Sequence, residues 1–279
     1  MSLTSESVVV ITGAASGMGR AMAIRFARET IAGLAISDVN AEGLAETLAM
    51  INRADLKVTS HIVNVSKEAE MRIFADEVVS AHSRVTHLIN NAGVALGGKV
   101  SEVSLEDMHW LIDINFWGVV HGTKIFMPYL EREGSAHIVN FSSIFGIIAP
   151  PGQATYCASK FAVRGFTEAL RHELEGTNIA VSVVHPGGVK TNIANSARMG
   201  SGVELSDEEI SKKRERINRN LDRTTPEQAA EVVLQGIKSR NPRIVIGSDA
   251  RLIQLIARVF PKRYFAIINR LSGGQITST

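Results

Sequence analysis

The stretch VVVITGAASGMGR, residues 8–20, decides the fold because an apolar, β-branched run passes through a glycine-rich turn into a helical pattern. In such a strand–turn–helix unit the first glycine permits the tight turn. The second lets the backbone approach a pyrophosphate, and the third allows close packing of helix on strand. The N-terminus of the helix then faces the anion. The position of this turn predicts a dinucleotide-binding site, whose loop residues are Gly13, Ser16, Gly17, Met18 and Gly19.

A carboxylate, Asp38, ends the second apolar run of the chain. An acidic residue at this place accepts hydrogen bonds from the ribose hydroxyls of NAD, and it repels a 2′-phosphate. No Lys or Arg directly follows Asp38, and Ser16 brings no positive charge to the glycine loop, so NAD is favoured over NADP. A turn or helix-capping role for Asp38 is the alternative. Arg20 is the one nearby residue that could serve a phosphate.

Short apolar runs alternate with longer segments of helical period. Expected strands cover residues 7–11, 34–37, 57–62, 86–89, 136–141, 179–184 and 243–246. Expected helices cover residues 20–28, 41–50, 68–82, 105–130, 154–174 and 226–239. With no linker between two halves, this order predicts one α/β domain over residues 1–250. Its fold is a doubly wound, Rossmann-type parallel sheet of seven strands with helices on both faces.

Two regions depart from the alternation. Residues 191–223 contain no expected strand, end in a charged run and are predicted to form a lid over the substrate. Residues 251–279 form an apolar and basic tail of helical period that Pro261 interrupts. We expect this amphipathic tail to pack on the domain or at a subunit interface. Contact with a membrane surface is the less favoured alternative.

The composition is that of a folded globular protein, with 45% hydrophobic and 21% charged residues among 279. The net charge is only +2 and no basic stripe carries interleaved aromatic residues, which argues against nucleic acid as a partner. Cys157 is the only cysteine and is interpreted as a small buried thiol. The eight histidines form no cluster of metal-ligand spacing, so no metal site is predicted. Without a signal peptide or a long apolar stretch, we expect a cytoplasmic protein.

Tyr156 and Lys160 are four residues apart and share one face of the expected helix. Lowering the pKa of a tyrosine from about 10 to 7–8 takes roughly 3–4 kcal/mol. An ammonium at about 4 Å supplies on the order of 4 kcal/mol at an effective dielectric near 20, and an oxidised nicotinamide adds positive charge. Burial opposes this shift, so Lys160 and the cofactor together must outweigh it. The pair predicts Tyr156 as an acid/base between an alcohol and a carbonyl compound.

These motifs resemble the classical short-chain dehydrogenase/reductase family over roughly residues 5–250. Residues 12–19 match T-G-x-x-x-G-x-G, residues 90–93 match N-N-A-G, and Tyr156 with Lys160 forms Y-x-x-x-K. A Pro-Gly pair follows the sixth expected strand. The resemblance implies a catalytic set of Asn115, Ser143, Tyr156 and Lys160.

The resemblance also implies a role for each of these side chains. The family places its serine thirteen residues before the tyrosine, which selects Ser143 over its neighbour Ser142. Ser143 is expected to hydrogen-bond the substrate oxygen as alkoxide character develops. Lys160 is expected to bind the nicotinamide ribose as well, Tyr156 to contact the cofactor too, and Asn115 to hold a water that relays protons.

Further cofactor contacts follow from the same resemblance. Asn91, Ala92 and Gly93 are expected along the adenosine ribose. Pro186, Gly187 and Val189 are expected beside the nicotinamide, with Thr191 on its carboxamide. Asn64 and Val65 are expected near the adenine, where the family commonly has an aspartate and this chain has an amide that can still accept a hydrogen bond.

The loops expected near the nicotinamide, residues 94–96 and 144–148, are largely apolar and lack an Arg to clamp an anion. We therefore expect a hydrophobic secondary alcohol or ketone as substrate. The family implies a homodimer or homotetramer. Alternative hypotheses are an NADPH-dependent carbonyl reductase, a non-catalytic NAD-binding sensor or scaffold, and a peripheral membrane protein whose tail is the functional element.

Overall fold

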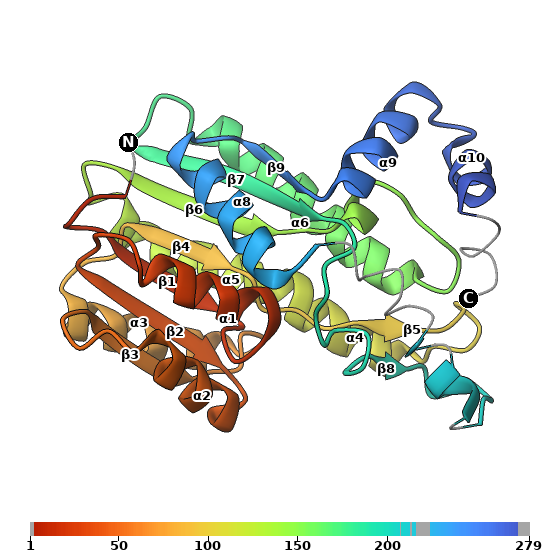
Figure 1. The fold of residues 1–279 in the computed structure, drawn as a ribbon, viewed down its shortest axis with the longest axis horizontal. Helices are drawn as coiled ribbons and strands as arrows, with labels where there is room; N and C mark the ends of the chain where they lie inside the picture. The colour runs from red at the N-terminus through yellow and green to blue at the C-terminus, as the bar shows by residue number, and fades with distance from the viewer. Residues whose placement is uncertain (1–2, 207, 213, 216–223, 273–279) are drawn as a thin grey trace.

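Seven parallel strands form the central sheet in the order β3-β2-β1-β4-β6-β7-β9 (Figure 1). The strands are β1 (Val8–Thr12), β2 (Gly33–Asp38), β3 (Lys57–Ile62), β4 (His87–Asn90), β6 (Ala136–Phe141), β7 (Ile179–Pro186) and β9 (Arg243–Ile246). The chain runs outward from β1 to β3 and returns to β4 on the other side of β1. Open α/β sheets bind ligands at the carboxyl ends of the strands beside such a reversal. The predicted doubly wound fold of seven strands is confirmed.

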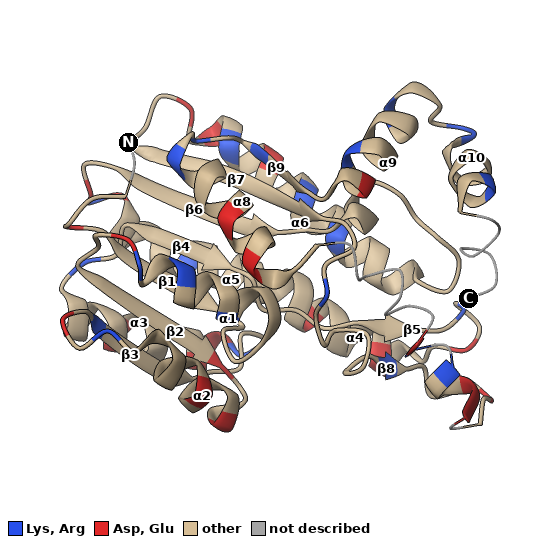
Figure 2. Ribbon diagram, viewed as in Figure 1, with Lys and Arg blue, Asp and Glu red and all other residues tan. Residues whose placement is uncertain are grey.

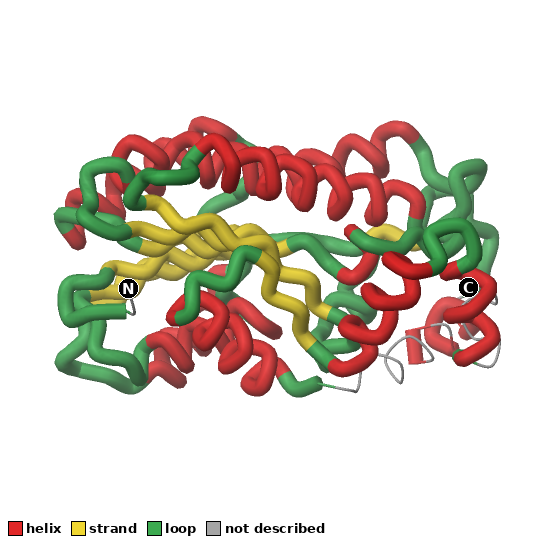
Figure 3. The backbone as a smooth tube through the Cα atoms, turned by 90° about the horizontal axis from the view of Figure 1, so that it is seen from above, coloured by secondary structure: helices red, strands yellow, loops and turns green. Residues whose placement is uncertain are grey.

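The computed structural model describes residues 3–206, 208–212, 214–215 and 224–272. Helices cover both faces of the sheet, so the molecule has three layers (Figure 3). One face carries α1 (Gly17–Phe26), α2 (Ala41–Ile51) and α8 (Pro226–Lys238). The opposite face carries α3 (Glu68–His82), α5 (Gly118–Leu130) and α6 (Ala154–Glu173).

The apolar run that opens the chain is explained by these two layers. Val9 and Ile11 of β1 belong to the core under α1 and α8, whereas Val10 belongs to the core on the other face. A strand that is buried on both faces needs apolar residues at every position rather than at alternate ones. The uninterrupted run therefore identifies β1 as a central strand.

The helix expected over residues 105–130 is three elements. It consists of α4 (Leu105–Ile112), a π-helical turn η1 (Asp113–Trp117) and α5. The chain stays helical through the π-helical turn, so the sequence predicts one continuous helix there. Such turns often occur at functional sites.

The prediction that residues 191–223 contain no strand was wrong. A short strand β8 (Arg198–Met199) pairs in parallel with β5 (Leu96–Gly97). The pairing is supported by Asp107 of α4, whose carboxylate accepts hydrogen bonds from Arg198 at 3.3 Å and from the Ser201 amide at 3.0 Å. A strand of only two residues is too short to show a periodic pattern in the sequence. Residues 207, 213 and 216–223 of the predicted lid lie outside the described residues.

The C-terminal tail forms two helices, α9 (Ser248–Val259) and α10 (Tyr264–Leu271), on either side of Pro261. Ile256 and Ile268 of these helices are buried in one cluster with Ile144 and Ile148. The tail therefore packs on the segment that follows β6. Residues 273–279 lie outside the described part of the chain. None of the helices in the described ranges is long and apolar enough to cross a membrane.

Candidate active site

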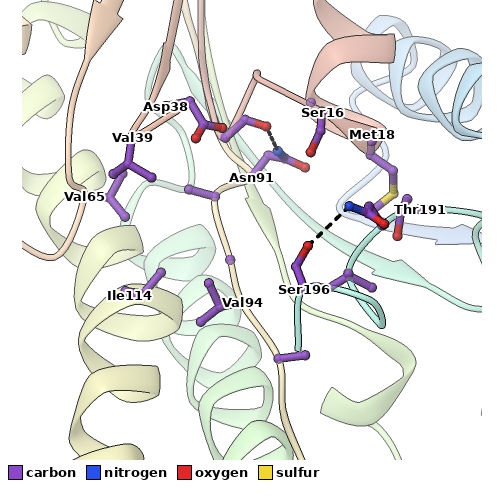
Figure 4. Close-up of a pocket in the computed structure, with 18 of the residues that line it drawn as sticks. Ser16, Met18, Asp38, Val39, Val65, Asn91, Val94, Ile114, Thr191 and Ser196 are labelled. Atoms are coloured by element: carbon purple, nitrogen blue, oxygen red, sulfur yellow. Dashed lines mark hydrogen bonds between the residues drawn. The ribbon is translucent and has the colours of Figure 1, made fainter. Parts of the chain in front are cut away.

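A cavity of about 270 Å³ opens at the carboxyl ends of β1, β2, β3 and β4 (Figure 4). Most of the predicted cofactor residues line it: Gly13, Ser16, Gly17, Met18, Gly19, Asp38, Asn64, Val65, Asn91, Ala92, Gly93 and Thr191. Figure 4 shows Asp38 and Val65 on one side of the cavity and Met18 and Thr191 on the other. The structure thus brings together residues that are up to 178 positions apart in the sequence.

The glycine-rich turn has the geometry that its sequence predicts. Gly13 has a φ of +70°, and a Cβ there would lie 2.7 Å from the Ala92 Cα. A Cβ on Gly19 would lie 1.9 Å from the carbonyl oxygen of Gly13, so only glycine permits this approach of α1 to the turn. Ser16, the N-cap residue of α1, makes no side-chain capping hydrogen bond, and the first turn contains no acidic residue. The N-terminal amides of α1 are therefore suited to an anion.

Asp38 lies at the end of β2 with its carboxylate fixed by backbone amides. Its Oδ2 accepts a hydrogen bond from the Ala15 amide at 3.0 Å, and its Oδ1 accepts one from the Asn40 amide at 3.1 Å. The Arg20 guanidinium donates to the Ala15 carbonyl at 2.5 Å and to Glu46 at 2.6 Å, and it does not line the cavity. Among the described residues that line the cavity there is no Lys or Arg. The charge at this end of the cavity is therefore negative.

Two of the predicted asparagines fasten the loops of the cavity. Asn91 donates to the carbonyl oxygens of Thr12 at 2.9 Å and Gly13 at 3.1 Å, which joins the end of β4 to the turn after β1. The Asn64 side-chain oxygen accepts from the amide and the hydroxyl of Ser66, at 3.1 and 2.8 Å. Both side chains are thus positioned by the protein itself.

The predicted catalytic pair lies on α6, beyond the cavity. The Lys160 Nζ lies 5.7 Å from the centre of the Tyr156 ring and donates to the carbonyl oxygen of Phe141 at 3.1 Å. Lys160 is buried. The ring of Phe145 meets that of Tyr156 edge to face, with 6.1 Å between centroids. The Tyr156 ring therefore has both an aromatic neighbour and the Lys160 ammonium beside it.

The structure distinguishes the two adjacent serines. The Ser142 hydroxyl is buried and donates to the Lys160 carbonyl oxygen at 2.8 Å, which gives it a structural role. The Ser143 hydroxyl instead accepts from the Phe145 amide at 3.1 Å and lies close enough to Tyr156 to lower its pKa in part. Of the two serines, Ser143 is thus the one whose hydroxyl is not bound to the Lys160 backbone, and its catalytic role stays a prediction.

Asn115 lies in the π-helical turn η1 and is completely buried. Its Oδ1 accepts from the Val94 amide at 2.8 Å, and its Nδ2 donates to the Val94 carbonyl at 2.9 Å and to the Ser159 hydroxyl at 3.3 Å. A Cβ on Gly93 would lie 3.2 Å from the Asn115 Oδ1 and 3.3 Å from the Lys160 Nζ. Gly93 thus connects the cavity with the catalytic group.

Burial is the main cause of the pKa shifts of Tyr156, Cys157 and Lys160. It raises the pKa of Tyr156 to about 12, although the hydrogen bond with Ser143 partly offsets the effect. Burial also lowers the pKa of Lys160 to about 8. Lys160 alone therefore does not outweigh burial, which places more weight on the cofactor's charge than the sequence argument did. Burial raises the pKa of the Cys157 thiol to about 12, in agreement with its interpretation as an inert buried thiol.

Five predicted cofactor residues do not line the cavity: Tyr156, Lys160, Pro186, Gly187 and Val189. The Val189 side chain is buried in the core. Gly187 packs against Asp249, the second residue of α9, because a Cβ on this glycine would lie 2.6 Å from both carboxylate oxygens. The same carboxylate accepts a hydrogen bond from the Gly188 amide at 2.8 Å. Sequence reasoning missed Asp249, since no motif links it to this turn.

Several other cavity residues were also missed: Val39, Val63, Ile114, Asn192, Ile193 and Ser196. The first four are each adjacent in sequence to a predicted site residue, so adjacency was the available signal. Ile193 and Ser196 follow Thr191 in the segment interpreted as a lid. Their presence extends the cavity wall into that segment.

The comparisons with known proteins identify the family. Residues 7–201 match the family model described as short chain dehydrogenase. A Mycobacterium tuberculosis protein that carries the name oxidoreductase SadH is 40% identical over 270 residues, which cover 96% of each chain. This chain therefore belongs to the short-chain dehydrogenase family of oxidoreductases.

Two solved structures show the same fold with a ligand. A short chain dehydrogenase/reductase from Burkholderia phymatum in complex with NAD has a TM-score of 0.80 and 31% identity, covering 91% of this chain and 95% of that one. A short chain dehydrogenase from Mycobacterium paratuberculosis bound to NAD has a TM-score of 0.76 and 26% identity, covering 90% and 100% of the two chains.

Proposed function

We propose that this chain is an NAD(H)-dependent oxidoreductase that interconverts an apolar secondary alcohol and its ketone, with Tyr156 as acid/base. The observation that carries the proposal is the arrangement around Gly93. This glycine lines the cavity, and Asn115 and Lys160 lie directly behind it. The Lys160 Nζ lies 5.7 Å from the centre of the Tyr156 ring, so a ligand bound along the cavity wall at Gly93 would end close to the acid/base group.

The cavity fits a nicotinamide dinucleotide. The uncapped N-terminus of α1 and the turn at Gly13 are suited to the pyrophosphate. The fixed carboxylate of Asp38 is suited to ribose hydroxyls and repels a 2′-phosphate. The lack of Lys and Arg among the described cavity residues supports NAD over NADP, as do the two NAD-bound relatives.

The chemistry is assigned to four side chains. A nicotinamide held in the cavity would supply the hydride acceptor for alcohol oxidation and the hydride donor for ketone reduction. Tyr156 takes the hydroxyl proton during oxidation and gives it back during reduction. Ser143 hydrogen-bonds the same oxygen and stabilises its developing negative charge. The Lys160 ammonium favours the phenolate form of Tyr156, and Asn115 holds the backbone of Val94 in place.

Apolar side chains favour an apolar substrate. Val94 and Ala95 line the cavity where it approaches Lys160, and Phe145 packs against the Tyr156 ring. An anionic substrate needs a buried cation to offset its desolvation, and Lys160 is already committed to the tyrosine and the Phe141 carbonyl. The homodimer or homotetramer, the cytoplasmic location, the domain limits and the lid stay predictions from the sequence.

The proposal is tested by initial rates of NADH formation from NAD⁺ with a panel of secondary alcohols. The panel pairs each apolar alcohol with a carboxylated analogue, and NADP⁺ replaces NAD⁺ in parallel. We expect turnover of apolar members with NAD⁺ and little with the carboxylated analogues. A preference for NADP⁺ would favour the carbonyl reductase. NADH binding by calorimetry without turnover of any alcohol or ketone would favour the sensor.

A further inference from the structure

The two tail helices have an inner face that packs on the protein and an outer face that does not. Ala250, Ile253 and Ile256 of α9 contribute to the cluster over Ile144 and Ile148. They follow one another at spacings of three residues, as one face of a helix requires. Figure 1 shows α9 and α10 at the end of the molecule opposite α2 and β3.

The outer face of α9 is a row of exposed apolar side chains. Leu252, Leu255, Val259 and Phe260 are 53%, 57%, 56% and 49% exposed. The first three are three and four residues apart, so they lie along a single face. We call these four residues the tail face. Large apolar side chains grouped in this way mark interaction surfaces, whereas single ones are ordinary.

From residue 250 to residue 272, all the charged side chains are positive, and the one acidic residue of α9, Asp249, is bound to the Gly188 amide at the start of the helix. Residues 250–272 include five basic residues and no acidic residue. The basic residues are exposed: Arg251, Arg258, Lys262, Arg263 and Arg270. Figure 2 shows them along α9, its connection to α10, and α10 itself. A whole chain of formal charge +2 thus carries a concentrated positive patch beside its exposed apolar row.

We propose that the tail face docks this protein on an anionic lipid surface. Amphipathic helices with apolar and basic side chains lie in the membrane interface with the apolar side chains buried at the headgroup boundary. The lack of acidic residues from 250 to 272 makes the surface complementary to anionic headgroups. The proposed contact is with the membrane surface, since no helix among the described residues is both long and apolar enough to cross a membrane.

A second copy of the chain is a poorer occupant of the tail face. In a two-fold dimer the same surface patch meets itself, so Arg258, Lys262 and Arg263 would oppose their own counterparts. Like charges facing each other at an interface are unfavourable. An anionic lipid surface can bury the apolar side chains and pair with the basic side chains at the same time.

The tail packs directly on the segment that follows Ser143, next to the candidate active site. The inner face of α9 packs on the segment that begins just after Ser143, and the Ala149 amide donates to the Tyr264 hydroxyl at 3.2 Å. Phe145 of this segment contacts Tyr156. If the proposed function holds, docking brings the site close to a membrane from which apolar substrates partition. The docking itself does not depend on catalysis.

The test is co-sedimentation of the full chain with vesicles, measured without cofactor or substrate. One set contains phosphatidylcholine mixed with an equal amount of phosphatidylglycerol, and the other contains phosphatidylcholine alone. Leu255→Ser/Val259→Ser removes half of the tail face. Met50→Ser/Ile73→Ser is the matched control, because those side chains are 53% and 60% exposed on the distant helices α2 and α3. Arg258→Glu is compared with Arg28→Glu, and thermal melting checks the fold of every variant.

We expect binding to the anionic vesicles, loss of this binding in Leu255→Ser/Val259→Ser, and none of these losses in the two controls. The surface potential contributes about fivefold in partitioning per basic residue, so Arg258→Glu should weaken binding roughly 25-fold. Added salt should weaken it too. Lack of binding to both vesicle types, or binding that the tail variants leave unchanged, would overturn the proposal. Dissociation of an oligomer by Leu255→Ser/Val259→Ser, without vesicle binding, would assign the tail face to a second copy.

Discussion

Replacing Lys160 by methionine tests the electrostatic part of the proposed mechanism, because it removes the ammonium and keeps the length of the side chain. At 5.7 Å from the Tyr156 ring, a unit charge is worth about 3 kcal/mol at an effective dielectric near 20. This free energy equals about 2 pKa units. Burial lowers the pKa of Lys160 to about 8, so its charge acts on Tyr156 below that pH. There, Lys160→Met should displace upward the pH at which the rate rises, in the same direction as the effect of burial on Tyr156.

The assay is kcat for alcohol oxidation against pH at saturating NAD⁺. The rate should rise with pH as Tyr156 loses its proton, and the inflection should move up by about 2 units in Lys160→Met. Below the inflection the rate should fall about a hundredfold. Lys124→Met, which changes an exposed lysine of α5, serves as the control. An inflection at the wild-type pH in Lys160→Met would refute the reasoning.

The same substitution has a cost for stability that must be measured separately. The Lys160 Nζ donates to the Phe141 carbonyl, so methionine leaves that buried oxygen without this donor. Loss of a buried partner costs about 1–3 kcal/mol. Urea unfolding of Lys160→Met should show a loss in this range while the shift in the pH profile persists in the folded fraction.

Three other perturbations give separate tests. Asp38→Asn removes the charge that faces the cavity but keeps an oxygen for the Ala15 amide. The ratio of kcat/KM for NAD⁺ over that for NADP⁺ should then fall about tenfold. An unchanged ratio would mean that Asp38 does not select the cofactor. Asp249→Ala removes the acceptor of the Gly188 amide and should lower the free energy of unfolding by about 1–3 kcal/mol, whereas Asp249→Asn should restore most of it; equal losses in the two variants would argue against this hydrogen bond. Burial lowers the pKa of His82, His87 and His185 to about 4 and that of His137 to about 3, so below pH 6.5 the unfolded chain binds protons that the folded chain does not. Stability should therefore fall from pH 7 to pH 5.5 by about 1 kcal/mol per histidine, and His137→Asn should lose about a quarter of this drop in urea midpoints. A flat pH dependence would contradict this result.

Much of the fold could be predicted because its determinants are local. The apolar run of β1 is uninterrupted, since that strand is buried on both faces, and each crossover helix shows its own period. The π-helical turn at Asn115 and the pairing of β8 with β5 could not be predicted. Both depend on contacts between distant segments, such as Asp107 with Arg198 and Ser201, rather than on local pattern.

The candidate site divides in the same way. The turn at Gly13 follows from strand, glycine and helix in order, and the spacing to Tyr156 distinguishes Ser143 from Ser142. The sequence could not show that Arg20 is engaged by Glu46 and Ala15, or that Asp249 supports the turn at Gly187. Nor could it show how far burial raises the pKa of Tyr156, because that depends on packing from several elements.

The central claim is that Tyr156 transfers the proton of the substrate. The most direct measurement is the rate of NADH formation from NAD⁺ with an apolar secondary alcohol, for the wild type and for Tyr156→Phe. The substitution removes only the hydroxyl and keeps the ring that packs on Phe145. We predict that turnover disappears while NADH binding persists. Turnover of Tyr156→Phe at the wild-type rate would contradict the proposed mechanism.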